Sequence, residues 1–367
     1  MTGVTPEGTQ RYAARFASHA APGHFREQQG LLLSSIGIGT YLGEADEATD
    51  RGYTDAIIAA VESGANVLDT AINYRFQRSE RSVRSALAEL ARRGYARDEL
   101  LVCTKGGFLT TDGEMSADPS EYFQREYVER GLIAAADVAA SCHVLAPRFL
   151  ADQIERSRRN LGVETIDVYY LHNPETQLGE YPREEFERRI RAAFEVLEVA
   201  VTEGKIRFYG LATWSGFRQP QNAKDYLSLG QIEIIARELA GDAHHFRFVQ
   251  LPYNLGMTEA LSRANQPLDT RTLPMIEAAH ALDVTLVASA SLLQGKVARD
   301  LPPFIAEALG LESDAERALQ FVRSTPGITT ALVGMSRAEH ARANLHLLGI
   351  PPASQERFSK LFERGAS

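Results

Sequence analysis

The sequence predicts an α/β protein in which a single domain folds as a (β/α)8 TIM barrel with long loops after its strands. Short β-rich runs alternate with longer helical patterns from about residue 31 onward, and this alternation indicates a parallel sheet. There are eight such runs and no second composition regime, so the sheet is expected to close on itself. The length of 367 residues suits such a barrel. We assign residues 31–367 to it and residues 1–30 to an N-terminal extension, part of which can be ordered.

The eight expected strands are rich in apolar and β-branched residues. They span residues 31–40, 66–71, 100–106, 166–173, 207–213, 248–254, 284–290 and 329–335. Helical spacing of apolar residues follows several of them, as in 53–64 and 79–94. We expect Ser79 to be the N-cap of the second of these helices, and Gly64 and Gly94 to end the two helices.

Three segments are longer than loops after barrel strands usually are. They cover residues 106–146, 214–245 and 294–310, and the first is expected to contain a short helix near 127–140. Loops after barrel strands surround the active site, so long ones are candidate lids and substrate walls. The acidic residues of the first segment leave two readings open, a contact surface for a polar or cationic substrate and a solvated surface loop.

Composition excludes several classes of protein. The formal charge is -9, from 39 basic and 48 acidic residues without a basic tract, which argues against a nucleic-acid partner. Two cysteines are too few for a disulfide framework or a cysteine zinc site. No stretch has the length of a signal peptide core or a membrane span, so we expect a cytoplasmic protein.

Four polar side chains stand where expected strands end. Asp69 ends the second strand with Tyr74 in the loop after it, Lys105 ends the third, and His172 ends the fourth. A buried ammonium or carboxylate is costly unless it is paired, so we expect Asp69 to pair with Lys105. A nearby ammonium lowers the pKa of a phenol, which would suit Tyr74 for proton transfer to or from a carbonyl or alcohol oxygen.

The chain resembles the aldo-keto reductase superfamily from about residue 31 to 348. The motifs that carry the resemblance are GIGTYLG (37–43), LDTAINY (68–74), TKGG (104–107), YYLHNPE (169–175), GKIRFYGLAT (204–213), VQLPYN (249–254) and LVGMSRAEHARANL (332–345). The resemblance implies a catalytic tetrad of Asp69, Tyr74, Lys105 and His172. In this tetrad Tyr74 is the general acid, and His172 places the carbonyl of a small-molecule aldehyde, ketone or alcohol.

The resemblance also implies NADPH as cofactor, with NADH not excluded. The implied cofactor-binding residues are Gly39, Thr40, Tyr41, Asp69, Thr213, Gln250, Leu293, Gly295, Gly334, Ser336, Arg337, His340 and Asn344. A helix N-terminus with Arg337 and a serine suits the 2'-phosphate of NADPH. Ser336 and Glu339 also fit a capping box at the start of that helix.

The chain departs from the family pattern at four cofactor positions. Ala212 and Thr213 replace the usual Ser-Asn pair, Ser289 replaces an aromatic that stacks on nicotinamide, and Ala343 replaces an acidic residue. Stacking on the nicotinamide would then come from Trp214 or Tyr253, or be weaker. These departures bear on cofactor affinity and on the choice between NADPH and NADH.

Two look-alike motifs carry no function. GIGTYLG has Leu42 where a dinucleotide-binding Rossmann fingerprint needs its last glycine. His244 and His245 lack the spacing of metal ligands, so we expect two solvated loop residues and no metal.

The leading hypothesis is an NAD(P)H-dependent oxidoreductase that interconverts a carbonyl and an alcohol. One alternative is a nucleotide-sensing regulatory subunit, because the potassium-channel beta subunits resemble the same family. Another is an isomerase that forms a Schiff base on Lys105.

Overall fold

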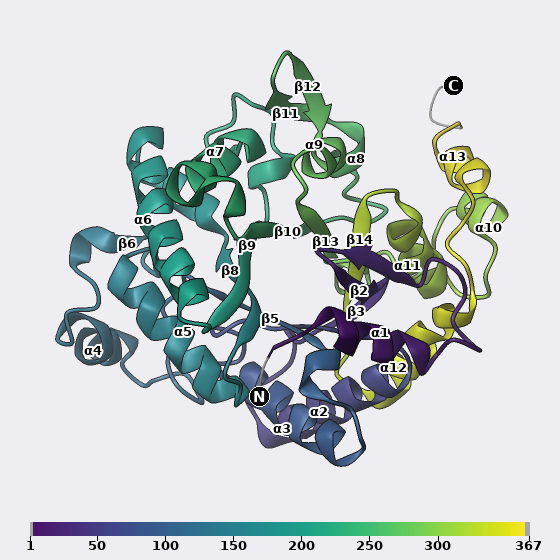
Figure 1. The fold of residues 1–367 in the computed structure, drawn as a ribbon, viewed down its shortest axis with the longest axis horizontal. Coiled ribbons are helices and arrows are strands. Elements are labelled where there is room, and N and C mark those ends of the chain that lie inside the picture. The colour runs from purple at the N-terminus through teal and green to yellow at the C-terminus, as the bar shows by residue number, and fades with distance from the viewer. Residues whose placement is uncertain (1–2, 364–367) are drawn as a thin grey trace.

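Eight parallel strands form a closed barrel in the computed structural model, which describes residues 3–363 (Figure 1). In chain order they are β3 (Ile36–Gly39), β4 (Val67–Asp69), β5 (Leu101–Gly106), β8 (Ile166–His172), β9 (Ile206–Ala212), β10 (Phe246–Pro252), β13 (Thr285–Ser289) and β14 (Ile328–Gly334). The strand order around the barrel is β10-β13-β14-β3-β4-β5-β8-β9. The predicted barrel and each of its eight strands are confirmed.

The first expected strand divides into two. β2 (Leu31–Ser34) pairs antiparallel with β1 (Phe25–Gln28), and only β3 enters the barrel. Ser34 still pairs with Phe25, and a bend at Ser35 separates β2 from β3. The Ser34 amide donates to the Asn66 side chain at 2.8 Å. A run of apolar residues therefore concealed a hairpin and a separate strand.

One helix packs outside the barrel after each strand. These helices are α2 (Glu47–Glu62), α3 (Arg78–Arg92), α5 (Pro147–Leu161), α6 (Arg183–Thr202), α7 (Leu229–Ala240), α9 (Met275–Ala281), α11 (Asp314–Ser324) and α12 (Ala338–Leu345). Gly64 and Gly94 follow α2 and α3 with φ of 102° and 85°, so the predicted stops are confirmed. The predicted N-cap is wrong, because α3 begins at Arg78 with Gln77 as its N-cap.

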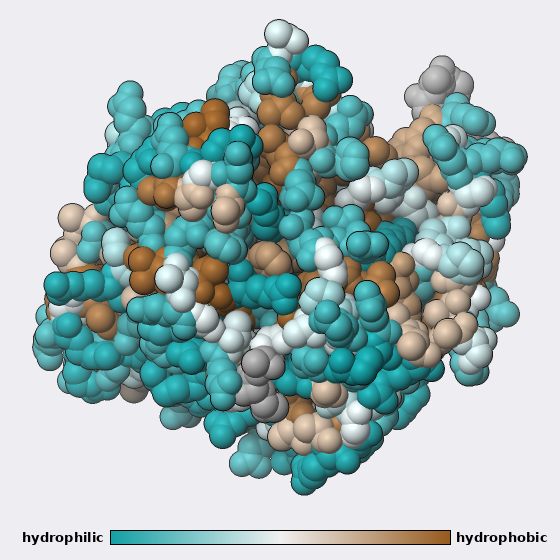
Figure 2. All heavy atoms as spheres, in the orientation of Figure 1, coloured by the Kyte–Doolittle hydropathy of each residue, from teal (hydrophilic) through white to brown (hydrophobic). Residues whose placement is uncertain are grey.

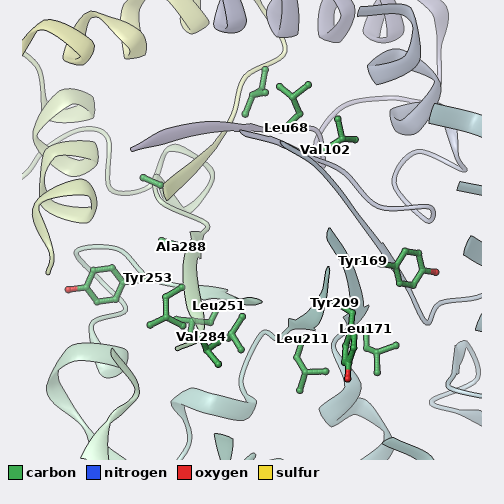
Figure 3. Close-up of a cluster of buried hydrophobic side chains, with 14 of the residues drawn as sticks. Leu68, Val102, Tyr169, Leu171, Tyr209, Leu211, Leu251, Tyr253, Val284 and Ala288 are labelled. Atoms are coloured by element: carbon green, nitrogen blue, oxygen red, sulfur yellow. The ribbon is translucent and has the colours of Figure 1, made fainter. Parts of the chain in front are cut away.

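The core has two layers. Residues on one face of each strand pack against the helices, and Figure 3 draws part of this layer, including Leu68, Leu171 and Leu251. Residues on the other face fill the barrel interior, among them Val67 and Val168. This division follows from the alternation of side chains along each strand.

The N-terminal segment closes the base of the barrel. α1 (Pro6–Ala14) and the β1–β2 hairpin pack there, and Val4, Leu31 and Leu33 belong to the interior cluster. The Val4 amide donates to Asp167 at 2.7 Å, and this carboxylate also pairs with Arg97 at 2.7 Å. The segment thus continues the core, while the division at residue 30 stays a prediction.

Two insertions interrupt the regular pattern. Residues 107–146 contain α4 (Pro119–Phe123), a π-helical turn and a hairpin of β6 (Val138–Ala139) and β7 (His143–Val144). The helix therefore lies earlier than expected. A second hairpin of β11 (Ala264–Leu268) and β12 (Arg271–Pro274), with the short α8 (Glu259–Ser262), was missed because its proline-containing strands look like loops. The other expected long loops are shorter, since α7 and α10 (Pro303–Leu309) occupy part of them.

The face of the molecule drawn in Figure 2 is mostly hydrophilic. Figure 2 shows separate hydrophobic patches on this face and no single continuous one. The chain ends its described part in α13 (Gln355–Glu363), which packs on α10. Within residues 3–363 no helix has the length and apolar character needed to cross a membrane.

Candidate active site

A pocket of about 690 Å³ opens at the carboxyl ends of the strands. The ladder registers bring these ends together: Asp69 lies beside Gly39, and Ala212 lies between His172 and Gln250. Of the four candidate catalytic residues, Asp69, Tyr74 and His172 line the pocket. Lys105 lies directly beneath them in the barrel interior.

Asp69 and Lys105 form a buried ion pair. Lys105 Nζ lies 2.6 Å from Asp69 Oδ2 and donates a second hydrogen bond to the Thr70 carbonyl at 2.8 Å. The side chains are 1% and 6% exposed, so neither charge would be tolerated alone. Burial opposes the charge on Lys105, but Asp69 and Tyr74 outweigh it and raise its pKa above the ordinary value. The predicted pairing is confirmed.

Tyr74 lies against this ion pair. Lys105 Nζ is 4.9 Å from the centroid of the Tyr74 ring, and the His172 ring centroid is 5.7 Å from it. Burial raises the pKa of Tyr74, while Lys105 acts in the opposite direction and lowers it. The predicted direction of the lysine effect is therefore right, but its expected net result is wrong because burial prevails.

His172 is held from behind by the insertion between β5 and α5. His143 of β7 lies with Nε2 2.8 Å from the His172 carbonyl, and Gln177 Nε2 donates to His143 Nδ1 at 2.9 Å. The Gln177 contact assigns the ring proton of His143 to Nε2, which then donates to the carbonyl. Burial, Lys105 and His143 place the pKa of His172 well below its ordinary value, so His172 is neutral at pH 7.

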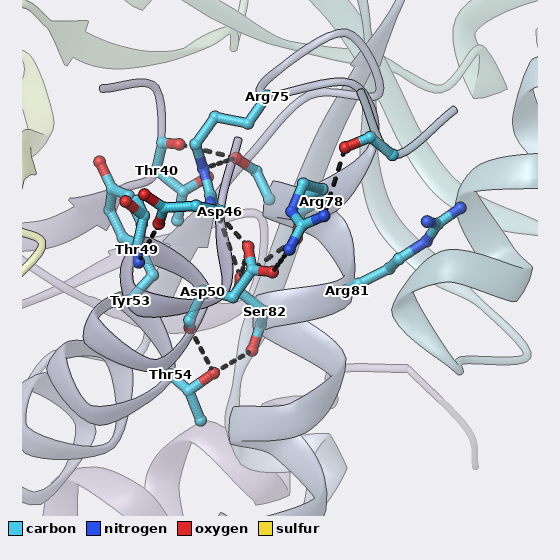
Figure 4. A network of polar contacts seen from close by, with 12 residues as sticks. Thr40, Asp46, Thr49, Asp50, Tyr53, Thr54, Arg75, Arg78, Arg81 and Ser82 are labelled. Atoms are coloured by element: carbon cyan, nitrogen blue, oxygen red, sulfur yellow. Dashed lines mark hydrogen bonds and ion pairs between the residues drawn. The ribbon is translucent and has the colours of Figure 1, made fainter. Parts of the chain in front are cut away.

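The loop after Tyr74 is fixed by a polar network (Figure 4). Arg75 donates to Asp50 of α2 at 2.6 Å and to Ser79 at 3.1 Å, and Ser79 donates to the Thr40 carbonyl at 2.9 Å. This last contact explains why Ser79 does not cap α3. The network ties the loop that carries Tyr74 to the loop that follows β3.

Nine of the implied cofactor residues line the pocket. They are Gly39, Thr40, Tyr41, Asp69, Thr213, Gln250, Leu293, Gly295 and Gly334. Ser336, Arg337, His340 and Asn344 do not line it and lie in the turn after β14 or in α12. A Cβ on Gly39 would meet nothing closer than 3.8 Å, so β3 borders open space here.

The start of α12 differs from the expected capping box. Its N-cap is Arg337, and no side chain caps the helix there. Ser336 precedes the N-cap and its carbonyl lies against Gly52 of α2, where a Cβ would come within 2.7 Å. The capping-box prediction is wrong, and the first amides of α12 have no side-chain acceptor in the described structure.

Only one of the two expected stacking residues reaches the pocket. Trp214 and Ser289 line it, and the indole is 50% exposed. Tyr253 is fully buried on the outer side of β10, where it stacks on Phe321 with centroids 5.4 Å apart. The prediction that Tyr253 could contact the cofactor is therefore wrong.

Several pocket residues were not singled out from the sequence. Asn73 precedes Tyr74, Asn173 follows His172, and Phe108 comes three residues after Lys105 with its ring 5.1 Å from that of His172. Their nearness to the catalytic candidates was a usable signal. The acidic residues of the insertion do not line the pocket; Asp112, for example, pairs with Arg81.

The histidine pair has structural partners. His244 is 3% exposed and lies 3.6 Å from Glu233, while His245 contacts Glu198 at 2.8 Å. The expectation of two solvated residues is wrong for His244. Among residues 3–363 no group of three or more His, Cys, Asp or Glu could hold a metal ion.

The polar groups of the pocket suit the nicotinamide end of a dinucleotide. Thr213 Oγ1 is buried without a hydrogen-bond partner in the described structure, and Gln250 presents a carboxamide beside it in the lining. Amide and hydroxyl groups of this kind can bind the carboxamide of a nicotinamide ring. The residues present therefore fit the implied cofactor.

Known proteins resemble this chain over spans that run from about half of it to nearly all of it. An uncharacterized oxidoreductase of Schizosaccharomyces pombe is 24% identical over 345 residues, covering 92% of this chain and 88% of the relative. The NADH-specific methylglyoxal reductase of Escherichia coli is 26% identical over 210 residues, 56% of this chain and 55% of its own. A crystal structure of an aldo/keto reductase from Klebsiella pneumoniae with NADP and acetate superposes with a TM-score of 0.60 at 21% identity, covering 93% and 94% of the two chains.

At 21% identity, the likeness to the Klebsiella pneumoniae structure shows that the two chains share a fold and nothing more. The model of the aldo/keto reductase family matches residues 35–363, which include all eight barrel strands and the pocket above them. The chain therefore belongs to the aldo/keto reductase family.

Proposed function

We propose that this protein is an NADPH-dependent reductase that converts an aldehyde or ketone to an alcohol, with Tyr74 as the proton donor. The observation that carries the proposal is one constellation: the buried Asp69–Lys105 pair lies 4.9 Å from the Tyr74 ring, and neutral His172 faces the same pocket. A phenol next to a fixed positive charge can donate a proton to a carbonyl oxygen, because the charge stabilises the phenolate that forms.

Each residue has a separate task. Tyr74 donates its hydroxyl proton to the substrate oxygen as negative charge develops there. Lys105 stabilises the resulting phenolate, and Asp69 keeps Lys105 charged and in place. His172, which is neutral, can hydrogen-bond the same oxygen through the ring nitrogen that faces the pocket. When bound, the reduced nicotinamide supplies the hydride.

The charged state of Lys105 argues against the Schiff-base alternative. A lysine nucleophile needs a lowered pKa, whereas Asp69 helps to raise that of Lys105 and holds its Nζ at 2.6 Å. No feature within residues 3–363 favours the regulatory-subunit alternative. The expected cytoplasmic location stays a prediction.

We infer a preference for NADPH from the turn after β14. Arg337 is exposed at the start of α12, and no ion pair or hydrogen bond engages its side chain in the described part of the chain. A free guanidinium beside uncapped helix amides suits a phosphate group. The relatives do not decide the matter, since one structure contains NADP and the E. coli reductase is NADH-specific by name.

The test combines cofactor binding with turnover. Purified protein is titrated with NADPH and NADH by fluorescence, and oxidation of the reduced cofactor is then followed with a panel of neutral aldehydes and ketones. We expect tighter binding of NADPH and turnover that Tyr74→Phe reduces by about 10²- to 10⁴-fold. Binding without turnover on any carbonyl would refute the reductase and favour the regulatory subunit.

A further inference from the structure

A glutamate outside the tetrad holds the loop that follows β9. Glu175 lies three residues after His172 and is 5% exposed. Its Oε1 accepts hydrogen bonds from the backbone amides of Trp214, Ser215 and Gly216 at 2.7, 2.9 and 3.3 Å. One carboxylate oxygen thus binds three consecutive amides of the neighbouring loop.

The same loop is held from its other side. The Trp214 carbonyl accepts a hydrogen bond from Arg218 at 3.0 Å, and Arg218 forms an ion pair with Glu259 at 2.9 Å. Gly216 permits the close packing, because a Cβ at this position would lie 2.7 Å from the Leu227 side chain. Both polar backbone groups of Trp214 are therefore engaged, and its side chain projects from a fixed position.

This fixed side chain is part of the pocket wall. Trp214 lines the pocket together with Asn173 and Phe108, and half of its surface is exposed. We propose that Glu175 is a positioning residue that fixes Trp214 as one wall of the substrate site and so determines which carbonyl compounds bind well. The proposal deepens the proposed function and rests on it for its kinetic consequences.

Burying the Glu175 carboxylate costs free energy, and its role in holding the loop after β9 accounts for that cost. Three backbone amides of the next loop hydrogen-bond Oε1, and Oε2 is buried without a partner in the described structure. Hydrogen bonds from amides to a carboxylate are shorter and stronger than those to a neutral acceptor. Glutamine would keep a weaker acceptor for the three amides, whereas alanine would leave them without one.

The single tryptophan makes this contact directly observable. Trp214 is the only tryptophan among the 367 residues, so intrinsic tryptophan fluorescence reports on this loop alone. Glu175→Gln and Glu175→Ala are compared with wild type without cofactor, by acrylamide quenching and by fluorescence anisotropy. The matched control is Glu180→Ala. Glu180 lies in the same segment as Glu175, after β8, but its carboxylate accepts a hydrogen bond from the Ala140 amide and not from the Trp214 loop.

We expect the quenching constant of Glu175→Ala to rise about twofold and its anisotropy to fall, because a released side chain moves on the nanosecond scale. Glu175→Gln should lie between alanine and wild type, and Glu180→Ala should match wild type. Circular dichroism confirms that each variant is folded. Equal quenching in wild type and Glu175→Ala would overturn the proposal, and if the alanine variant does not fold, equal quenching in Glu175→Gln would do so.

A kinetic comparison tests the consequence for specificity. In Glu175→Ala we expect KM for the bulky 4-nitrobenzaldehyde to rise about tenfold more than KM for the small methylglyoxal, as a displaced wall affects the larger substrate more. Parallel changes in both KM values would reject the specificity role. Failure of the wild type to reduce any carbonyl would instead reject the proposed function, and the fluorescence result would still decide whether Glu175 holds Trp214.

Discussion

Gln250 donates a hydrogen bond to Asp69 Oδ1 at 2.8 Å, on the carboxylate oxygen opposite the one that Lys105 contacts. The family resemblance implies only a cofactor-binding role for Gln250. In the structure it also completes the environment of the carboxylate, because both Asp69 oxygens now have a donor. Under the proposed cofactor role of Gln250, this one side chain would serve both cofactor binding and the placement of Asp69 against Lys105.

Replacing Gln250 should affect both properties. We expect Gln250→Leu to lower kcat/KM and raise the Kd of NADPH, each by about tenfold, since a hydrogen bond to a charged group contributes about 1.5–3 kcal/mol. Gln250→Glu should be worse, because it places a second carboxylate against Asp69. Steady-state kinetics and fluorescence titration give the two quantities. A fully active Gln250→Glu enzyme would contradict this contact.

Tyr74 predicts the pH dependence of both reaction directions. Its pKa is raised above 10 by burial, with Lys105 opposing, so the phenol stays protonated through neutral pH. Reduction needs the protonated form and is lost only as pH rises through that pKa. We therefore expect kcat/KM for reduction to be flat up to about pH 9 and alcohol oxidation to increase with pH. An alkaline loss of reduction with a midpoint near pH 7 would argue against Tyr74 as the donor.

Arg337 should set the cofactor preference. Arg337→Ala is expected to raise the Kd of NADPH by about tenfold or more and to leave that of NADH unchanged, because only NADPH carries the 2'-phosphate. Arg342→Ala is the matched control, since it removes another exposed arginine of α12. Titration of each variant with both cofactors measures the effect. An equal rise in the Kd values of NADPH and NADH would mean that Arg337 does not bind the 2'-phosphate of NADPH.

The pocket lining predicts selection against anionic substrates. Within the described residues the lining holds one charged group, Asp69, which Lys105 neutralises, and His172 is uncharged. A substrate carboxylate would find no cation there, and burying it unpaired costs several kcal/mol. We expect kcat/KM for methyl 4-formylbenzoate to exceed that for 4-carboxybenzaldehyde by about 100-fold. These compounds differ mainly in charge, so similar values would show that the substrate acid lies in solvent.

The buried pair at the barrel base should dominate its stability. Arg97 and Asp167 are 3% and 0% exposed at 2.7 Å, so Asp167→Asn leaves an uncompensated arginine and should cost about 3–5 kcal/mol. The exposed Arg11–Asp98 pair is the control, and Arg11→Ala should cost about 1 kcal/mol or less. Urea unfolding measures both. Equal small losses would mean that water reaches Arg97.

The sequence predicted the positions of the catalytic candidates because an apolar strand that ends in a polar residue is a local pattern. Asp69, Lys105 and His172 each follow such a run, and a barrel brings strand ends together. Contacts between distant loops have no local pattern. The Gln250–Asp69 bond joins residues 181 positions apart, and Glu175 binds backbone amides, which no side-chain motif reveals.

Some of the errors were avoidable and others were not. Side chains alternate along β10, so Gln250 on the inner face places Leu251 and Tyr253 on the outer face, where the structure has them in the helix-facing core. Alternation counted from Gln250 would have excluded Tyr253 from the cofactor site. Ser79, by contrast, is a favourable N-cap residue by type, and only its contact with the Thr40 carbonyl changes its role.

The insertion after β5 limits how this enzyme can be engineered. A designer who wished to admit larger substrates would be tempted to shorten residues 107–146 as a surface decoration. His143 belongs to this segment and its ring supports the His172 backbone at 2.8 Å. Deletion of the β6–β7 hairpin would therefore remove the support of the His172 backbone, whereas residues 115–117, which lie outside helices and strands, are the place to cut.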